Sequence, residues 1–238
     1  MRAMLLTSAS VGALILATGA QAADLARPVY KAPPARLPAW TWTGFYVGGT
    51  VGAVVGNDRV SNDPASPVQW LVSPINTNSV GIIGGLEAGY NWQVSQIVLG
   101  IEGDVSVSSL KQSANGTSLG ATTPTFSSRL NTLSTIRGRL GWAFDRTLLY
   151  GTGGVAFANL KDQLIDPAFP FTDRTGSSVT GWTAGLGVEY AFTDHWTAKA
   201  EYLHVGFSQR AATTNVAGYI FDYRDRLDIG RVGINYKF

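Results

Sequence analysis

The 238-residue sequence contains no cysteine and carries little charge. Without cysteine, the chain cannot form a disulfide framework, a cysteine-ligated metal site, a reactive thiol or the acylation site of a bacterial lipoprotein. Charged residues make up 14% of the sequence, whereas globular domains usually carry about 25%. The formal net charge is +2 and no basic block occurs, so no nucleic-acid partner is expected.

Long hydrophobic runs are also absent after the first 22 residues, which argues against a later membrane-spanning helix. The N-terminus has the order of a secretory signal peptide, with a basic start at Arg2, an apolar stretch and small residues before the mature chain. We predict that residues 1–22 are a signal peptide, cleaved after Ala22 or Ala23. A membrane anchor is the alternative, but the apolar stretch is shorter than the ~20 residues that a spanning helix needs.

Proline is confined to a few places. Four of the ten prolines lie between residues 24 and 39, and the other six fall in predicted loops. Because proline removes a backbone donor and favours extended structure, residues 23–42 are predicted to be a Pro-rich N-terminal periplasmic segment. Residues 43–238 form the second predicted region, a barrel domain.

Apolar residues alternate with small or charged residues through most of this second region. Eight alternating segments begin near residues 44, 79, 96, 131, 148, 180, 196 and 226. Short connections near 93–95, 145–146 and 193–195 alternate with long ones near 58–78, 110–129, 162–178 and 209–225. The predicted fold class is all-β, an eight-stranded antiparallel up-and-down transmembrane β-barrel with short periplasmic turns and long extracellular loops. The outward face of residues 148–159 stays open, because glycines there permit a bulge.

The polar faces of these segments carry equal numbers of acids and bases, which allows charges enclosed in a lumen to pair. The predicted lumen charge network is Glu87, Glu102, Asp104, Arg137, Arg139, Glu189, Lys199, Glu201, Arg231 and Lys237. In an antiparallel hairpin, opposing positions sum to a constant. A turn centred on Asp194 therefore places Glu189 opposite Lys199.

Aromatic residues gather near the chain ends and the short turns, which predicts a girdle at one membrane interface. Its predicted members are Trp40, Trp42, Phe45, Tyr46, Tyr90, Trp92, Trp142, Phe144, Tyr190, Phe192, Trp196, Tyr236 and Phe238.

Several stretches together resemble a known family. The sequences WTGFYVGGTVG, GGLEAGYNWQ, GIEGD, RGRLGWAF, YGTGGVAF, GLGVEYAFTDHWTAKAEYLHV and RVGINYKF are similar to small outer-membrane surface antigens of alphaproteobacteria, which are porin-family barrels related to the opacity and OmpA barrels. The resemblance implies location in the bacterial outer membrane, with outer-membrane lipid and lipopolysaccharide as partners. It also implies insertion by the outer-membrane assembly machinery, which reads a C-terminal aromatic signal. The matching residues here are Val232, Ile234, Tyr236 and Phe238.

The residues do not predict an enzyme, a metal site or a cofactor. The two histidines, His195 and His204, lack the spacing of a metal site. His204 and Ser208 share a strand face but lie about 13 Å apart, which is too far for a hydrogen bond. Neither nucleotide-binding fingerprint occurs.

We therefore predict a structural outer-membrane barrel and surface antigen that contributes to envelope integrity, with a lumen filled by charged residues. Two alternatives stay open. One is a narrow porin-like channel for small solutes, because glycines such as Gly81, Gly85, Gly185 and Gly187 line the inner faces. The other is an adhesin or ligand-binding barrel that acts through its extracellular loops, whose ligand the sequence does not identify.

Overall fold

A computed structural model describes residues 40–64, 71, 73–115, 117, 123, 125–165, 172–208, 210–213 and 220–238. The predicted signal peptide, its cleavage site at Ala22 or Ala23, and most of the predicted Pro-rich segment lie outside the described residues. The compact unit runs from Trp40 to Phe238.

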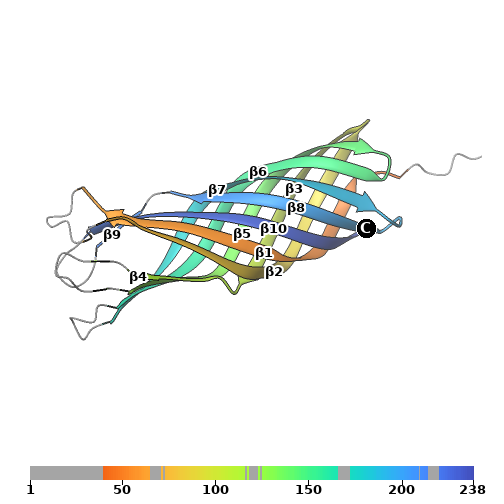
Figure 1. Ribbon diagram of the computed structural model, residues 1–238. Coiled ribbons are helices and arrows are strands. Elements are labelled where there is room, and N and C mark those ends of the chain that lie inside the picture. The colour runs from red at the N-terminus through yellow and green to blue at the C-terminus, as the bar shows by residue number, and fades with distance from the viewer. Residues whose placement is uncertain are drawn as a thin grey trace, which may run out of the picture. The chain divides into compact units, whose positions relative to one another are not determined.

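The described part of this unit contains ten strands and is closed into a barrel (Figure 1). The strands are β1 (Gly44–Asn62), β2 (Ile75–Val94), β3 (Ile97–Ser108), β4 (Lys111–Asn115), β5 (Thr125–Phe144), β6 (Thr147–Ile165), β7 (Thr172–Ala191), β8 (Trp196–Phe207), β9 (Arg210–Thr213) and β10 (Ile220–Lys237).

Eight strands form the closed wall, in the order β1-β2-β3-β5-β6-β7-β8-β10, and antiparallel pairing of β1 with β10 closes the ring. The short strands β4 and β9 pair with β5 and β10 beyond the ends of β3 and β8. Closure satisfies the backbone donors and acceptors that lipid cannot satisfy. The predicted fold class is confirmed.

The short turns lie close to the predicted positions. Ser95 and Asp145 begin the two-residue turns after β2 and β5, and both have a positive φ, of 57° and 53°. Positive φ is a requirement of tight hairpin turns, and aspartate is among the residues that tolerate it. These turns, with the one at 192–195, define the short-turn end of the barrel; the opposite end is the long-loop end.

The strands extend further toward the long-loop end than the sequence predicted. Residues 58–62 were expected in a loop but belong to β1, where Asn62 pairs with Phe221 of β10. Similarly, β5 begins at Thr125 rather than near residue 131. The polar residues of these extensions mask the apolar alternation, yet the backbone ladder continues through them.

The odd-numbered residues of β6 face outward and its even-numbered residues face the interior. Leu149 and Phe157 face outward and are about half exposed, while Leu148 and Ala156 are buried. The bulge lies instead on β5, where the pairing with β6 shifts between Leu130 and Thr132.

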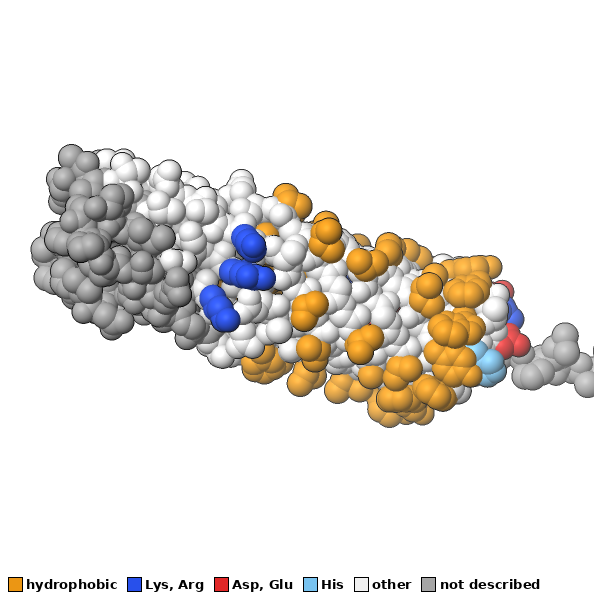
Figure 2. All heavy atoms as spheres, turned by 90° about the horizontal axis from the view of Figure 1, so that it is seen from below, with side chains coloured by type: hydrophobic (Ala, Val, Ile, Leu, Met, Phe, Trp, Pro, Cys, Tyr) orange, Lys and Arg blue, Asp and Glu red, His pale blue; other side chains and the backbone are white. Residues whose placement is uncertain are grey.

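The outer surface carries a belt of hydrophobic side chains (Figure 2). Val51, Leu86, Leu140 and Val232 are all at least 56% exposed, which would be costly in water and favourable against lipid. Within the described residues, no helix is long and apolar enough to cross a membrane, a finding that does not concern crossing by strands.

Candidate functional site in the barrel interior

Nine charged side chains are packed together inside the barrel. None of the nine is more than 6% exposed. We call this group the charged layer; it consists of Glu87, Glu102, Asp104, Arg137, Arg139, Glu189, Lys199, Glu201 and Arg231.

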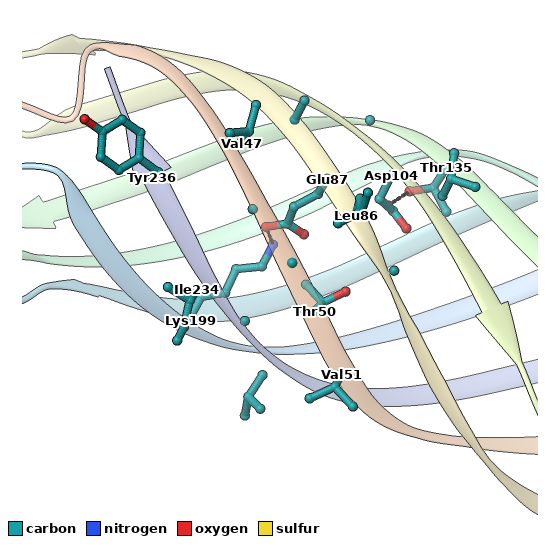
Figure 3. Close-up of a pocket in the computed structure, with 18 of the residues that line it drawn as sticks. Val47, Thr50, Val51, Leu86, Glu87, Asp104, Thr135, Lys199, Ile234 and Tyr236 are labelled. Atoms are coloured by element: carbon teal, nitrogen blue, oxygen red, sulfur yellow. Dashed lines mark hydrogen bonds and ion pairs between the residues drawn. The ribbon is translucent and has the colours of Figure 1, made fainter.

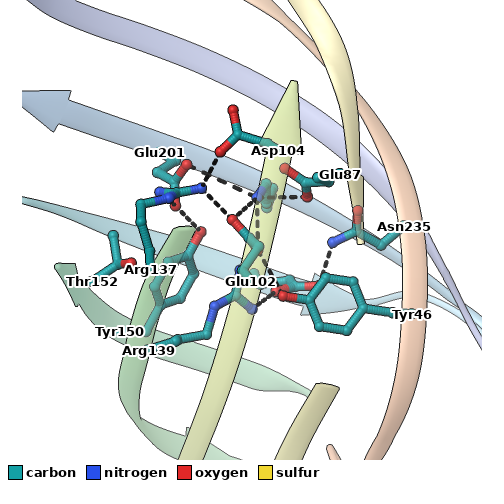
Figure 4. A network of polar contacts seen from close by, with 12 residues as sticks. Tyr46, Glu87, Glu102, Asp104, Arg137, Arg139, Tyr150, Thr152, Glu201 and Asn235 are labelled. Atoms are coloured by element: carbon teal, nitrogen blue, oxygen red, sulfur yellow. Dashed lines mark hydrogen bonds and ion pairs between the residues drawn. The ribbon is translucent and has the colours of Figure 1, made fainter. Parts of the chain in front are cut away.

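Arg137 of β5 joins three carboxylates of this layer (Figure 4). Its Nη2 pairs with Glu102 and lies 3.2 Å from Asp104 Oδ2, and its Nη1 lies 3.2 Å from Glu201 Oε1. The Arg137 side chain has no exposed surface. A buried carboxylate without a partner is costly, so this guanidinium stabilises three buried carboxyl groups together.

Arg139 makes a second bridge, nearer the short-turn end of β5. Its Nη2 lies 2.6 Å from Glu102 Oε2 and its Nη1 lies 2.7 Å from Glu189 Oε2. Its guanidinium carbon also lies 4.0 Å from the centre of the Tyr150 ring. Arginine suits this position because its planar fork binds two carboxylates and stacks on a ring.

Glu189 lies opposite Lys199 in the ladder of β7 and β8, as the turn position predicted. The two side chains nevertheless choose other partners. Lys199 Nζ lies 2.6 Å from Glu87 Oε1 of β2, while Glu189 pairs with Arg139. The lumen of an eight-stranded barrel is narrow, so long side chains reach strands that are not their ladder neighbours.

Arg231 of β10 follows the ladder more closely. It lies opposite Glu201 of β8, and its Nη2 is 2.6 Å from Glu201 Oε2. Its Nη1 lies 3.2 Å from Asp104 Oδ1 of β3. One guanidinium therefore connects two distant parts of the wall.

Lys237 does not belong to the charged layer, contrary to the sequence prediction. Its Nζ lies 4.7 Å from the centre of the Trp40 ring, at the short-turn end. It takes part in none of the ion pairs found among the described residues. As the last residue of β10, it is too near the barrel mouth to reach the carboxylates. The expected balance of five acids and five bases thus becomes five acids and four bases.

Neutral donors supply the remaining hydrogen bonds to the carboxylates. The Tyr46 hydroxyl donates to Glu102 over 2.7 Å, and the Tyr150 hydroxyl donates to Glu201 over 3.1 Å. Asn235 Nδ2 donates to Glu189 over 3.1 Å. These donors satisfy carboxylate oxygens without adding positive charge.

Sequence reasoning missed the two inward tyrosines. Tyr46 lies directly opposite Gly89, and Tyr150 lies directly opposite Gly187. A Cβ added at Gly89 or Gly187 would come within 2.4 or 2.5 Å of the facing hydroxyl. The available signal was this cross-strand pairing of tyrosine with glycine, in which the ring covers the glycine.

An apolar layer fills the interior nearer the long-loop end, and the sequence did not predict it. Its buried members include Leu203 and Val205 of β8 and Ile229 of β10, two to four residues beyond Glu201 and Arg231 toward the long-loop end. The full apolar layer is Val54, Ile83, Leu110, Leu130, Leu133, Ala156, Ala158, Leu160, Leu203, Val205, Leu227 and Ile229.

Trp42 closes the interior at the short-turn end. It is 2% exposed and packs with Val98, Ala143 and Leu148. Its backbone N–H donates to Gln93 Oε1 over 2.7 Å. Trp42 therefore lies inside the mouth, and Tyr46 lies deeper in the lumen, so neither belongs to the predicted girdle.

Most other predicted girdle residues do face outward around the short-turn end. Exposed members include Trp92, Trp142, Phe144, Tyr190 and Trp196. Three of the predicted assembly residues lie on the outward face of β10, and Phe238 follows the end of the strand. Val232, Ile234 and Phe238 are 53–67% exposed, and Tyr236 is half-buried against Trp196 and Phe238.

The histidines form no catalytic arrangement with Ser208. His204 Nδ1 lies 2.8 Å from Asp228 Oδ1, and its ring lies against Trp182 on the outer face. His195 stacks on Tyr236 in the short-turn region. Among the described residues, no group of three or more potential ligands could hold a metal ion.

Comparisons with known proteins agree with this architecture. Residues 10–238 match the family described as outer membrane protein beta-barrel domain. The chain is 33% identical to a 31 kDa outer-membrane immunogenic protein of Brucella melitensis, over 97% of this chain and 98% of the relative. It is 29% identical to a 22 kDa outer membrane protein of Rhizobium leguminosarum, over 84% and 80% of the two chains.

Two solved structures share the fold at low sequence identity. The outer membrane protein OprG of Pseudomonas aeruginosa matches with a TM-score of 0.52 and 12% identity, over 82% of this chain and 96% of that one. The outer membrane protease OmpT of Escherichia coli matches with a TM-score of 0.50 and 11% identity, over 85% and 99%. These likenesses concern the barrel alone. By its match over residues 10–238 and its full-length relatives, the chain belongs to the family of outer-membrane β-barrel proteins.

Proposed function

We propose that this protein is a closed structural barrel and surface antigen, which contributes to envelope integrity and presents its long-loop end at the cell surface. The observation that carries the proposal is the filled interior. Along the axis, the Trp42 cluster, the charged layer and the apolar layer follow one another from the short-turn end. The naming of relatives as immunogenic outer-membrane proteins supports the surface role.

The narrow-channel alternative loses its main support in this interior. It rested on inward glycines that would leave space, but neighbouring groups occupy those positions. A Cβ at Gly187 would meet the Tyr150 hydroxyl at 2.5 Å, and one at Gly81 would meet Leu110 Cα at 2.7 Å. Eight-stranded barrels generally have interiors just wide enough for side chains to fill.

The same proposal includes no catalytic step. The acid and base side chains of the interior are engaged with one another in a compact layer, with none more than 6% exposed. A substrate would have to displace either the Trp42 cluster or the apolar layer before reaching them.

Epitope insertion tests the orientation and the surface role. A tag between Asp63 and Pro64, at the long-loop end, should bind antibody on intact cells. The matched tag between Asp145 and Arg146, in a short turn, should bind only after the outer membrane is permeabilised. The opposite pattern would place the long-loop end in the periplasm and refute the proposal.

Assembly through the C-terminal aromatic residue forms part of the proposal. The Phe238 ring lies 5.7 Å from that of Phe45 on the outer face, and its exposed surface leaves it accessible to a partner. Deleting Phe238 should lower the amount of folded protein in the outer membrane, while barrel that does fold keeps its unfolding midpoint. Wild-type amounts of folded protein after deletion would refute this role.

A further inference from the structure

A row of basic side chains crosses three strands on the outer face. Lys111 of β4 lies opposite Arg129 of β5, which in turn lies opposite Lys161 of β6. All three side chains are exposed. Figure 2 shows basic side chains grouped beyond the margin of the hydrophobic belt. We call Lys111, Arg129 and Lys161 the basic row.

The bulge on β5 is what places Arg129 in this row. Below the bulge, the odd-numbered residues Arg137 and Arg139 face the interior, as Leu133 does. The pairing shifts by one residue between Leu130 and Thr132, so that Arg129 faces outward and Leu130 faces inward. A bulge re-aims the following side chains in this way. Without it, Arg129 would point into the apolar layer.

The basic row is uncompensated on its own face. Within the described part of the chain, none of the ion pairs involves Lys111, Arg129 or Lys161. Three neighbouring cations repel one another, and a bound anion would relieve that repulsion. The row therefore has the charge of an anion site.

A hydroxyl and amide row separates the basic row from the hydrophobic belt. Asn159 Nδ2 donates to Thr132 Oγ1 over 2.8 Å, and Ser178 Oγ donates to Asn159 Oδ1 over 2.8 Å. Thr132 faces outward below Arg129, on the other side of the bulge, and Asn159 is the next outward side chain below Lys161. From the hydrophobic belt toward the long-loop end, the outer face therefore carries apolar side chains, then hydroxyl and amide groups, then cationic groups.

A shallow groove in the belt leads up to these rows. Its floor is formed where Ala88 and Gly103 lie opposite each other, and its sides include Leu86, Val105 and Ile136. Figure 3 shows Val47, Leu86 and Val51 around it, with the Glu87–Lys199 pair behind the wall. Ser134 and Phe157 line its upper part, one outward step below Thr132 and Asn159.

We propose that the groove and the two rows form a binding site for an anionic glycolipid of the outer leaflet. An acyl chain would lie over Ala88 and Gly103, sugar hydroxyls would meet Thr132 and Asn159, and acidic headgroup oxygens would pair with the basic row. Only an amphiphile with all three parts matches this order along one face. The inference rests on outer-membrane location and does not depend on whether the lumen conducts.

Bisphosphorylated lipid A, titrated onto the folded full chain in neutral detergent and followed by native mass spectrometry, tests the headgroup contacts. The double change Lys111→Gln with Lys161→Gln should weaken binding about tenfold, as expected for the loss of two exposed ion pairs. The matched control Arg59→Gln with Arg226→Gln removes the same charge from exposed positions on β1 and β10 and should leave affinity within about twofold. Replacing both lysines by arginine should retain binding.

The groove is tested separately with leucine at an outward glycine. A Cβ at Gly103 would meet only the Thr135 carbonyl oxygen, at 3.8 Å, and one at Gly230 of β10 would meet nothing within 4 Å. Both substitutions should therefore fold, and heat-modifiable migration on gels checks this. Gly103→Leu should weaken lipid A binding about tenfold by filling the groove, and Gly230→Leu should not.

Three results would overturn the proposal. An equal loss of lipid A affinity in the Lys111→Gln/Lys161→Gln and Arg59→Gln/Arg226→Gln variants would show unspecific attraction to positive charge. Equal affinity for phosphatidylglycerol and lipid A would remove the role of the sugar. Binding unchanged by Gly103→Leu would remove the groove.

Discussion

The charged layer and the apolar layer occupy the same lumen and share strands β2, β5, β8 and β10, yet one is held by ion pairs and the other by apolar packing. On β8, Lys199 and Glu201 belong to the charged layer, while Leu203 and Val205, on the same face, belong to the apolar layer. The stability of the charged layer depends on ion pairing and tolerates little change of charge. The stability of the apolar layer depends on close packing and tolerates little change of side-chain volume. A barrel interior therefore need not follow one rule along its whole length.

The largest effect is expected in the charged layer. Arg137→Met keeps much of the side-chain volume but removes one of the two guanidinium groups, the other being Arg231, that contact Glu102, Asp104 and Glu201. We expect a loss of about 3–5 kcal/mol in the free energy of unfolding, as for other broken buried pairs. Urea unfolding in lipid vesicles would measure it.

The matched control is Arg146→Met. The Arg146 side chain is 37% exposed and pairs with exposed Asp194, so its loss should cost at most about 1 kcal/mol. If the two arginine variants were equally stable, burial of the charged layer would contribute nothing to its energetics.

The apolar layer should respond to volume instead. Leu133→Ala, at a side chain that is 2% exposed, should cost about 2–4 kcal/mol through lost burial and the cavity that remains. The control on the same strand is Leu140→Ala, which is 60% exposed on the outer face and should cost less than half as much. If both variants lost the same free energy of unfolding, an apolar side chain in the apolar layer would stabilise the barrel no more than one facing lipid.

A double-mutant cycle measures which residue pairs within the charged layer interact. Lys199 is the ladder partner of Glu189 but lies 2.6 Å from Glu87. The coupling energy of Lys199→Met with Glu87→Gln should be about 1–3 kcal/mol, and the coupling with Glu189→Gln should be clearly smaller. A larger coupling with Glu189 would show that ladder neighbours, not partners from other strands, determine the pairing.

Much of the fold could be predicted because alternation and spacing are local signals. The segment from Val80 to Trp92 fixes its own faces by its pattern, and the short turn near Asp145 fixes the hairpin around it. The position of Glu87 inside the barrel follows from the same pattern.

The apolar layer escaped prediction because the local contrast disappears there. Near Leu133, apolar and hydroxyl residues occupy both faces, and the bulge after Leu130 reverses the phase. The partners inside the charged layer depend on which strands face each other across the lumen, as with Lys199 and Glu87. That information exists only once the barrel is closed.

Single-channel recording of the purified, folded protein in planar bilayers shows whether the Trp42 cluster, the charged layer and the apolar layer together fill the lumen. We expect no stable open state for the wild-type chain. We also expect the Trp42→Ala variant to show no stable conductance, because the charged and apolar layers still fill the interior behind residue 42. A stable conductance of porin size in the wild-type protein would show that the lumen is open.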